Sequence, residues 1–273
     1  MRNAMTDRLL WEVECKPIYV PGQENIASKA LVRSDNGKLL GIRSKHYHPV
    51  FNRDLEAIKE RILSTDAFNF KGHQEFQGGK RILSFYENKR DNLKICGEDV
   101  KDYLIIGNSN DASSKLFVGT SSYMFRCENQ FSEKIRAYER RHDRPFNIHE
   151  IRIEEIIETY ELGRKDLYGK MEQLQSIEAN MEIIHALAVK LLKTETRTDR
   201  IGTSEMIKNT PQHVQFLKCI ETEIKDLGPT LWGVFNGVTR YTSNHLKGNP
   251  GFGVVNGLGE RMNREAMEIL LNH

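Results

Sequence analysis

The sequence has few cysteines, and they lie far apart along the chain. The four are Cys15, Cys96, Cys127 and Cys219, and no two of them form a Cys-x-x-Cys pair. Structural zinc modules and disulfide-rich secreted domains need closely and regularly spaced cysteines, so this spacing argues against both. A reducing compartment fits best, and we predict a cytoplasmic protein.

Long hydrophobic runs are also missing. Residues 1–14 carry charges where a signal peptide has its apolar core, and no later stretch is long and apolar enough to cross a bilayer. We therefore expect neither secretion nor insertion into a membrane. With 38% hydrophobic and 29% charged residues, the composition is that of a globular protein.

A strong excess of charge is absent as well, because the net charge is only +2. A polyanionic partner must then be bound by a local cluster of cations rather than by the protein as a whole. The chain also lacks the Gly-Lys-Ser/Thr signature of a P-loop, and the glycine-rich residues 248–259 follow no strand. We interpret these glycines as a flexible loop and expect no cofactor.

The N-terminal half reads as strands with one helix. Residues 30–32 and 39–42 are apolar runs separated by Asn36-Gly37, a pair that favours a tight hairpin turn. Residues 52–63 have apolar side chains at helical spacing, with Asn52 as a candidate N-cap. Further β-rich runs occupy residues 81–86, 103–106 and 115–118.

The hydrophobic period changes to that of helices after about residue 130. Helices are predicted over residues 148–162, 171–192, 230–245 and 257–271, and Thr210-Pro211 should open another that ends at Gly228. We therefore predict an α+β fold in which an antiparallel, hairpin-rich half (1–130) packs against a helical half (131–273). No proline- or serine-rich linker divides the halves, so both should belong to one domain.

Cations and aromatic rings on hairpins are typical of nucleic-acid contacts, because cations neutralise phosphates and rings stack on bases. One group lies between residues 43 and 81, and a second basic cluster lies between residues 134 and 144. The candidates for contact with a nucleic acid are Arg43, Lys45, Tyr47, Lys80, Arg81, Arg140 and Arg141. A solvated sheet face and a charged linker are the structural alternatives.

A metal site is the chemical alternative. His46 and His48 alternate on one side of an extended segment, and His73 could supply a third imidazole. Residues 108–114 form an unusual polar run whose Asp111 could join a metal-dependent hydrolase site. The same composition is typical of a turn, and no catalytic triad has recognisable spacing. The sequence leaves open whether the protein is an enzyme. We favour a non-enzymatic protein and assign no catalytic residue.

Six motifs occur in an order that resembles the phage/plasmid-like protein family, also catalogued as domain of unknown function 932. They are KALVRSDNGKLLG (29–41), HYHPV (46–50), QGGKR (77–81), NSNDASS (108–114), FRCEN (125–129) and LWGVFNGVT (231–239). Family members typically carry His-Asp-Gly-Ser-Ser in the polar run, whereas this chain has Asn110 in place of the histidine and Ala112 in place of the glycine. The departure weakens any catalytic role for the run.

The resemblance implies a phage, prophage or plasmid origin, hence the host cytoplasm, but no established activity. The order of hairpin, strand and helix also looks like the core of RecT/Redβ-type single-strand annealing proteins, which is an analogy of fold alone. The leading hypothesis is a non-enzymatic, homo-oligomeric protein that binds single-stranded DNA and anneals strands in recombination or replication. The alternatives are a metal-dependent nuclease or hydrolase, and an anti-defence protein that binds a host protein.

Overall fold

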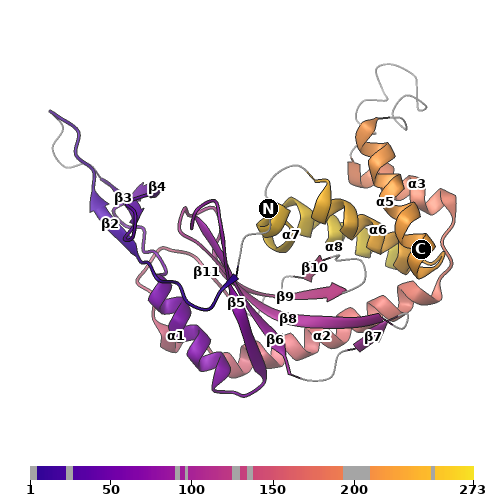
Figure 1. The fold of residues 1–273 in the computed structure, drawn as a ribbon, viewed down its shortest axis with the longest axis horizontal. Helices are drawn as coiled ribbons and strands as arrows, with labels where there is room; N and C mark the ends of the chain where they lie inside the picture. The colour runs from indigo at the N-terminus through magenta and orange to yellow at the C-terminus, as the bar shows by residue number, and fades with distance from the viewer. Residues whose placement is uncertain are drawn as a thin grey trace. The chain divides into compact units, whose positions relative to one another are not determined.

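The computed structural model describes residues 5–22, 27–89, 93–95, 98–124, 130–133, 138–192, 210–246 and 250–273. Two antiparallel sheets occupy the N-terminal half and helices occupy the C-terminal half, which confirms the predicted α+β fold (Figure 1). The chain divides into two compact units, of which unit 1 comprises residues 1–91, 102–120 and 134–162, and unit 2 the rest. The predicted halves, 1–130 and 131–273, stay a prediction. None of the helices described here has the length and apolarity needed to span a membrane.

Unit 1 contains a three-stranded sheet, which we call the β-arm (Figure 1). Its strands, in the order β2-β3-β4, are β2 (Val13–Pro17), β3 (Ser28–Arg33) and β4 (Leu39–Ser44). The predicted hairpin joins β3 to β4. Gly37 has φ +70°, a conformation that favours glycine, and the Asn36 side chain accepts a hydrogen bond from the Lys38 amide at 2.9 Å.

Helix α1 (Asn52–Leu63) follows the β-arm at the predicted position. The predicted cap was wrong: the Asp54 carboxylate accepts a hydrogen bond from the Phe51 amide at 2.8 Å, in the manner of a capping box. Asn52 is buried and donates its amide to the Trp11 carbonyl at 2.6 Å, so it ties α1 to the segment before the β-arm. The helix buries Leu55 and Ile58 in the core of unit 1.

The larger sheet has the strand order β1-β5-β6-β8-β9-β10, with β7 beside β8 and β11 beside β9. Side chains on one face of β6 and β8 alternate into the core shared with α1, which includes Ile82, Leu104 and Ile106. The strands are β1 (Met5–Thr6), β5 (Phe68–Phe76), β6 (Arg81–Asn88), β7 (Leu93–Ile95), β8 (Glu98–Ser109), β9 (Leu116–Met124), β10 (Gln130–Glu133) and β11 (Glu139–Arg140).

Helices supply most of unit 2, after a short 3₁₀ helix, η1 (Ile148–Glu150), in unit 1. They are α2 (Ile153–Ser176), α3 (Met181–Leu192), α5 (Pro211–Leu227), α6 (Leu231–Asn244), α7 (Pro250–Asn256) and α8 (Leu258–Leu271). Thr210 caps α5 as predicted, because its hydroxyl accepts a hydrogen bond from the His213 amide at 3.2 Å. The flexible loop predicted over residues 248–259 was wrong where the structure describes it, since α7 and the start of α8 lie there.

Close packing of α5 on α6 depends on glycine. A Cβ added to Gly237 would clash with the backbone of Ile220, and one added to Gly233 would lie 2.5 Å from the Gly228 carbonyl oxygen. Both glycines therefore let the two helix backbones approach closely. Around this contact, Phe216, Trp232 and other buried side chains form the core of unit 2.

Candidate nucleic-acid interface

The polar run predicted from the sequence is a tight turn between β8 and β9. The Ser109 hydroxyl donates a hydrogen bond to the Ser114 carbonyl at 2.7 Å and accepts one from the Ser114 amide at 2.9 Å. The Asp111 carboxylate accepts a hydrogen bond from the Ser113 amide at 3.0 Å. These local bonds account for the Ser, Asp and Asn content of the run as turn chemistry.

One residue of this turn has an unfavourable backbone conformation. Ala112 has φ +53°, in the left-handed region that glycine adopts without steric cost. Ala112 occupies the position at which the family resembled in the sequence analysis typically carries glycine. The turn geometry therefore gives a physical reason for a glycine at this position, independent of any catalytic role.

Buried asparagines join the β8–β9 turn to two other segments of unit 1. Asn108 is fully buried and donates its side-chain amide to the Val50 carbonyl at 3.1 Å. Asn110 donates its side-chain amide to the Gly79 carbonyl at 2.8 Å and its backbone amide to the Lys80 carbonyl at 2.7 Å. The turn that precedes β6 is thus held rigidly against the turn that follows β8.

Three predicted cations from distant parts of the sequence meet around these turns. The Arg43 guanidinium on β4 donates hydrogen bonds to the Asp111 carbonyl and, at 2.7 Å, to the Ile42 carbonyl. Arg81, the first residue of β6, donates its Nε–H to the Ser113 hydroxyl at 2.8 Å. Lys80 precedes Arg81 and is half-buried. The fold therefore gathers Arg43, Lys80 and Arg81 in one region, which the sequence could not show.

Two further cations, outside the set predicted from the sequence, belong to this region. Lys29 on β3 lies directly opposite Arg43 on β4 in the antiparallel register, so two positive charges face each other across the strands. A directly opposed pair of like charges costs stability. Lys38 lies against the β5–β6 turn, where a Cβ on Gly78 would clash with its side chain. We call Lys29, Lys38, Arg43, Lys45, Lys80 and Arg81 the cationic cluster.

Acidic partners are scarce around this cluster. The ion pairs of the β-arm join Arg33 to Asp35 at 2.8 Å and to Glu75 at 2.5 Å, and Lys16 to Glu14 at 3.0 Å. Within the described residues, no ion pair is formed by Lys29, Lys38 or Lys45. An opposed like-charge pair without carboxylate partners attracts an external anion.

Two of the residues predicted to contact a nucleic acid are buried. Tyr47 is only 9% exposed, its ring stacks on His142 at 5.1 Å between centroids, and its hydroxyl donates to the Ser109 carbonyl at 3.3 Å. Burial raises the pKa of the Tyr47 hydroxyl. Arg140 is 6% exposed and donates to the carbonyls of Arg144 and Pro145 at 2.7 and 2.5 Å. Neither side chain can serve as an exposed contact.

The other member of the second basic cluster is accessible. Arg141 directly follows β11 and is exposed, so it stays a candidate for phosphate contact. Residues 134–137 of that cluster, and the motif at 125–129, lie outside the described residues. The sequence could not separate Arg140 from Arg141, because β11 is only two residues long and shows no readable alternation.

The histidines considered for a metal do not come together. His73 on β5 is fully buried, with Nδ1 2.8 Å from the Ser84 hydroxyl and Nε2 3.1 Å from Glu56 Oε1. Burial lowers the pKa of His73 to about 4, although the Glu56 carboxylate acts in the opposite direction. His46 is exposed and His48 is half-buried. Within the part of the chain that the structure describes, no three His, Cys, Asp or Glu side chains, Asp111 included, are placed to hold a metal ion.

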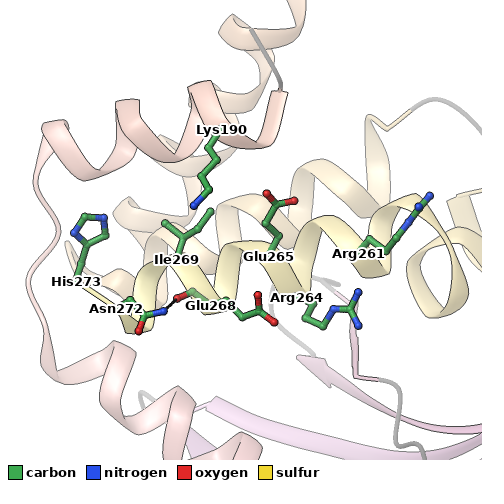
Figure 2. A pocket seen from close by; sticks show the side chains of 8 residues that line it. All are labelled: Lys190, Arg261, Arg264, Glu265, Glu268, Ile269, Asn272 and His273. Carbon is green, nitrogen blue, oxygen red and sulfur yellow. Dashed lines mark hydrogen bonds between the residues drawn. The ribbon is translucent and has the colours of Figure 1, made fainter. Parts of the chain in front are cut away.

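A hollow of about 610 Å³ lies in unit 2, between α3 and α8. Figure 2 shows Lys190 pointing from α3 toward Ile269 of α8, with the Asn272 amide bonded to the Glu268 carbonyl at 2.7 Å. The side chains that line the hollow are Lys190, Arg261, Arg264, Glu265, Glu268, Ile269, Asn272 and His273. Cations and carboxylates alternate here, so the hollow favours a polyanion less than the cationic cluster does.

Comparison with protein families gives one match. The model described as domain of unknown function, DUF932, matches residues 39–267, which includes β4, the β8–β9 turn and the whole of α6. The chain belongs to the DUF932 family. No curated protein and no solved structure matches it.

Membership of DUF932 confirms the family resemblance seen in the six motifs. It adds no activity, because the family is described by its unknown function. The match begins at Leu39, so Arg43, Lys45, Lys80 and Arg81 fall inside the family domain and Lys29 falls before it. Phage or plasmid origin, strand annealing and the likeness to RecT-type proteins stay predictions.

Proposed function

We propose that this DUF932 protein binds single-stranded DNA through the cationic cluster and acts without catalysis, in recombination or replication of a phage or plasmid. The observation that carries the proposal is the convergence of Arg43, Lys80 and Arg81 on one rigid pair of turns. Cations held in fixed positions can neutralise phosphates without first being ordered, so less entropy is lost on binding.

The opposed charges of Lys29 and Arg43 support the same proposal. Arg33 in the same sheet is neutralised by Asp35 and Glu75, whereas Lys29 and Arg43 face each other. A phosphate near both side chains turns the repulsion into attraction. Contact with phosphates is independent of sequence, which suits a protein that covers or pairs arbitrary strands.

Binding is tested by fluorescence anisotropy with labelled single-stranded and double-stranded DNA of roughly 30 nucleotides. The titrations are made at about 50 mM and about 200 mM salt, since release of counterions makes phosphate contacts depend on salt. We expect tighter binding of the single strand and weaker binding at the higher salt. Absence of binding to both DNAs at the lower salt contradicts the proposal.

The site is tested with the double variant Arg43→Ala/Lys45→Ala. Loss of two phosphate contacts should weaken binding by about tenfold or more and reduce the slope of log K against log salt by about 1.4, or about 0.7 for each contact. The matched control is Lys218→Ala/Lys225→Ala on α5, which removes the same charge from exposed positions of unit 2. Equal effects of both double variants would point to net charge alone and overturn the site.

Annealing and assembly are separate steps of the proposal. Pairing of two complementary strands by one protein requires several copies along a strand, so we expect a homo-oligomer. Sedimentation with and without the single strand measures assembly, and the rate of pairing of two labelled complementary strands measures annealing. If the protein binds single-stranded DNA but does not speed the pairing of complementary strands, it is a single-strand-binding protein and the annealing role is wrong.

A further inference from the structure

Tyr47 is buried, so the aromatic ring that the sequence predicted for contact with a base is not exposed beside the cationic cluster. Nonspecific single-strand binding combines cations for phosphates with exposed rings for bases. Tyr19 has the most exposed aromatic ring of the described residues, with 84% of its surface accessible. It lies two residues after the end of β2, at the edge of the β-arm.

The end of β2 that precedes Tyr19 is the end of the β-arm with the facing cations. Pro17, the last residue of β2, pairs with Lys29, and Lys29 pairs with Arg43. Beyond this row, the Lys45 amide donates to the Ala27 carbonyl at 3.0 Å, which extends the contact between the hairpin arms. Tyr19 follows the last residue of β2 at this end of the sheet.

Alternation along the strands separates the facing cations from the Lys16–Glu14 ion pair. Side chains two residues apart in a strand point to the same side, and residues that pair in the register share a side, so Pro17, Lys29 and Arg43 form one row on one side of the β-arm. The opposite side carries the Lys16–Glu14 ion pair and the exposed side chains of Leu39 and Ile42. The exposed Tyr19 ring thus follows, by two residues, the end of the row that carries Lys29 and Arg43.

This end of the β-arm carries groups that suit a single strand better than an apolar protein partner. Lys29 and Arg43 supply positive charge there, and the chain that leaves β2 at this end exposes one aromatic ring two residues later. Bases of a duplex are stacked on each other and paired, whereas an unpaired base can place its face on a tyrosine ring. The combination therefore favours an unpaired strand over a duplex.

We propose that Tyr19 stacks on an unpaired base of a nucleic-acid strand whose phosphates contact Lys29, Arg43 and Lys45. This inference rests on the proposed function and assigns the base contact of the same site. Tyr19 supplies the preference for single strands, and the cations supply the affinity for phosphates. The β-arm then carries both parts of the recognition, and the turns with Lys80 and Arg81 receive the backbone of the strand.

The test compares Tyr19→Ala and Tyr19→Phe in the anisotropy titration. Loss of one stacked base should weaken binding of the single strand by roughly 5-fold to 100-fold, whereas phenylalanine should retain nearly all of the affinity. The slope of log K against log salt should stay that of the wild type, because no cation is removed. Ile42→Ala, on the opposite side of the β-arm, is the matched control and should bind as the wild type does.

A strand that keeps the phosphates but lacks the bases separates stacking from charge. Wild type and Tyr19→Ala should bind an abasic oligonucleotide equally well, and both should bind it more weakly than the wild type binds the normal strand. Tyr19→Ala binding the normal strand with wild-type affinity would overturn the stacking role while leaving the proposed function intact. Failure of the wild type to bind any strand would overturn the proposed function itself.

Sedimentation of the same variants addresses the other occupant that an exposed ring could have. If Tyr19→Ala lowers the mass of the particle in the absence of DNA and leaves single-strand affinity unchanged, the ring contacts a second copy of the chain and the stacking proposal is wrong. An unchanged mass with weakened single-strand binding supports it.

Discussion

Replacement of Lys29 by glutamate should stabilise unit 1 and weaken binding of DNA at the same time. Lys29 and Arg43 are directly opposed in the β3–β4 register, and neither reaches a carboxylate through an ion pair among the described residues. A directly opposed pair contributes roughly 0.2–1 kcal/mol, unfavourable for like charges and favourable for opposite charges. Lys29→Glu replaces an unfavourable like-charge pair with a favourable opposite-charge pair. We therefore expect the free energy of unfolding to rise by about 1 kcal/mol at low salt.

The assay is urea unfolding followed by the fluorescence of Trp11. This ring is buried in unit 1, with Arg33 4.0 Å from its centroid and Glu75 accepting its Nε1–H at 2.8 Å. Trp232 lies in unit 2, so a Trp232→Phe background leaves Trp11 as the only indole. About 1 M salt shortens the Debye length to roughly 3 Å and should remove most of the gain.

Two further variants and one binding measurement complete this test. Lys29→Gln removes the repulsion without adding attraction and should give about half of the gain. Lys29→Glu/Arg43→Glu restores a like-charge pair and should lose it. Single-strand affinity should fall by about tenfold in Lys29→Glu, because a phosphate then meets a carboxylate. Lower stability of Lys29→Glu than of the wild type at low salt would refute the argument, as would a gain that salt does not change.

Three other predictions concern the fold. Gly237→Ala should lower the free energy of urea unfolding of unit 2 by about 2 kcal/mol, because its Cβ clashes with Ile220, whereas Gly169→Ala, whose Cβ meets nothing within 4 Å, should raise it by up to about 1 kcal/mol. Ala112→Gly should raise the unfolding free energy of unit 1 by about 1 kcal/mol, since glycine adopts φ +53° freely. The stability of unit 1 should fall by up to about 3 kcal/mol as the pH falls from about 6.5 to about 4, because His73 with a pKa of about 4 stays neutral in the fold while the unfolded chain takes up a proton.

A specific experimental outcome would contradict each of these predictions. Equal effects of Gly237→Ala and Gly169→Ala would show that α5 and α6 are not in close contact. A less stable Ala112→Gly would show that the turn does not hold the left-handed conformation. His73→Gln, which cannot take up a proton, should flatten the change in stability between pH 6.5 and pH 4. An unchanged pH profile in this variant would assign the titration to another group.

Local chemistry in the sequence was sufficient for most of the elements. The Asn36-Gly37 pair identified the β3–β4 hairpin, because positive φ is needed in so short a turn and glycine supplies it. Apolar spacing predicted α1, and Thr210-Pro211 predicted the start of α5. The flexible loop predicted for the glycine-rich segment was wrong where the structure describes it. Tertiary packing holds α7 and α8 as helices despite the low helix propensity of glycine.

The sequence also identified the basic character of the site, but it could not tell contact residues from structural ones. Tyr47 and Arg140 look like exposed contact residues in the sequence, and burial against His142 and the carbonyl of Pro145 gives both a structural role. Tyr19 has no distinguishing neighbour in the sequence, because its exposure depends on what packs around the β-arm. Exposure is a property of the tertiary structure, and no local pattern encodes it.

What the sequence by itself determined is therefore most of the elements, the family and the types of charged group available, all of which depend on residues close together in the chain. The predicted helices 148–162 and 171–192 had the wrong bounds, because α2 runs through the gap between them and ends at Ser176. Only the tertiary structure decided that Arg43, Lys80 and Arg81 meet at two turns and that Lys29 faces Arg43. The reason is physical. Strand pairing and buried asparagine bonds join segments separated by tens of residues, and their register is set by the packing of the whole unit.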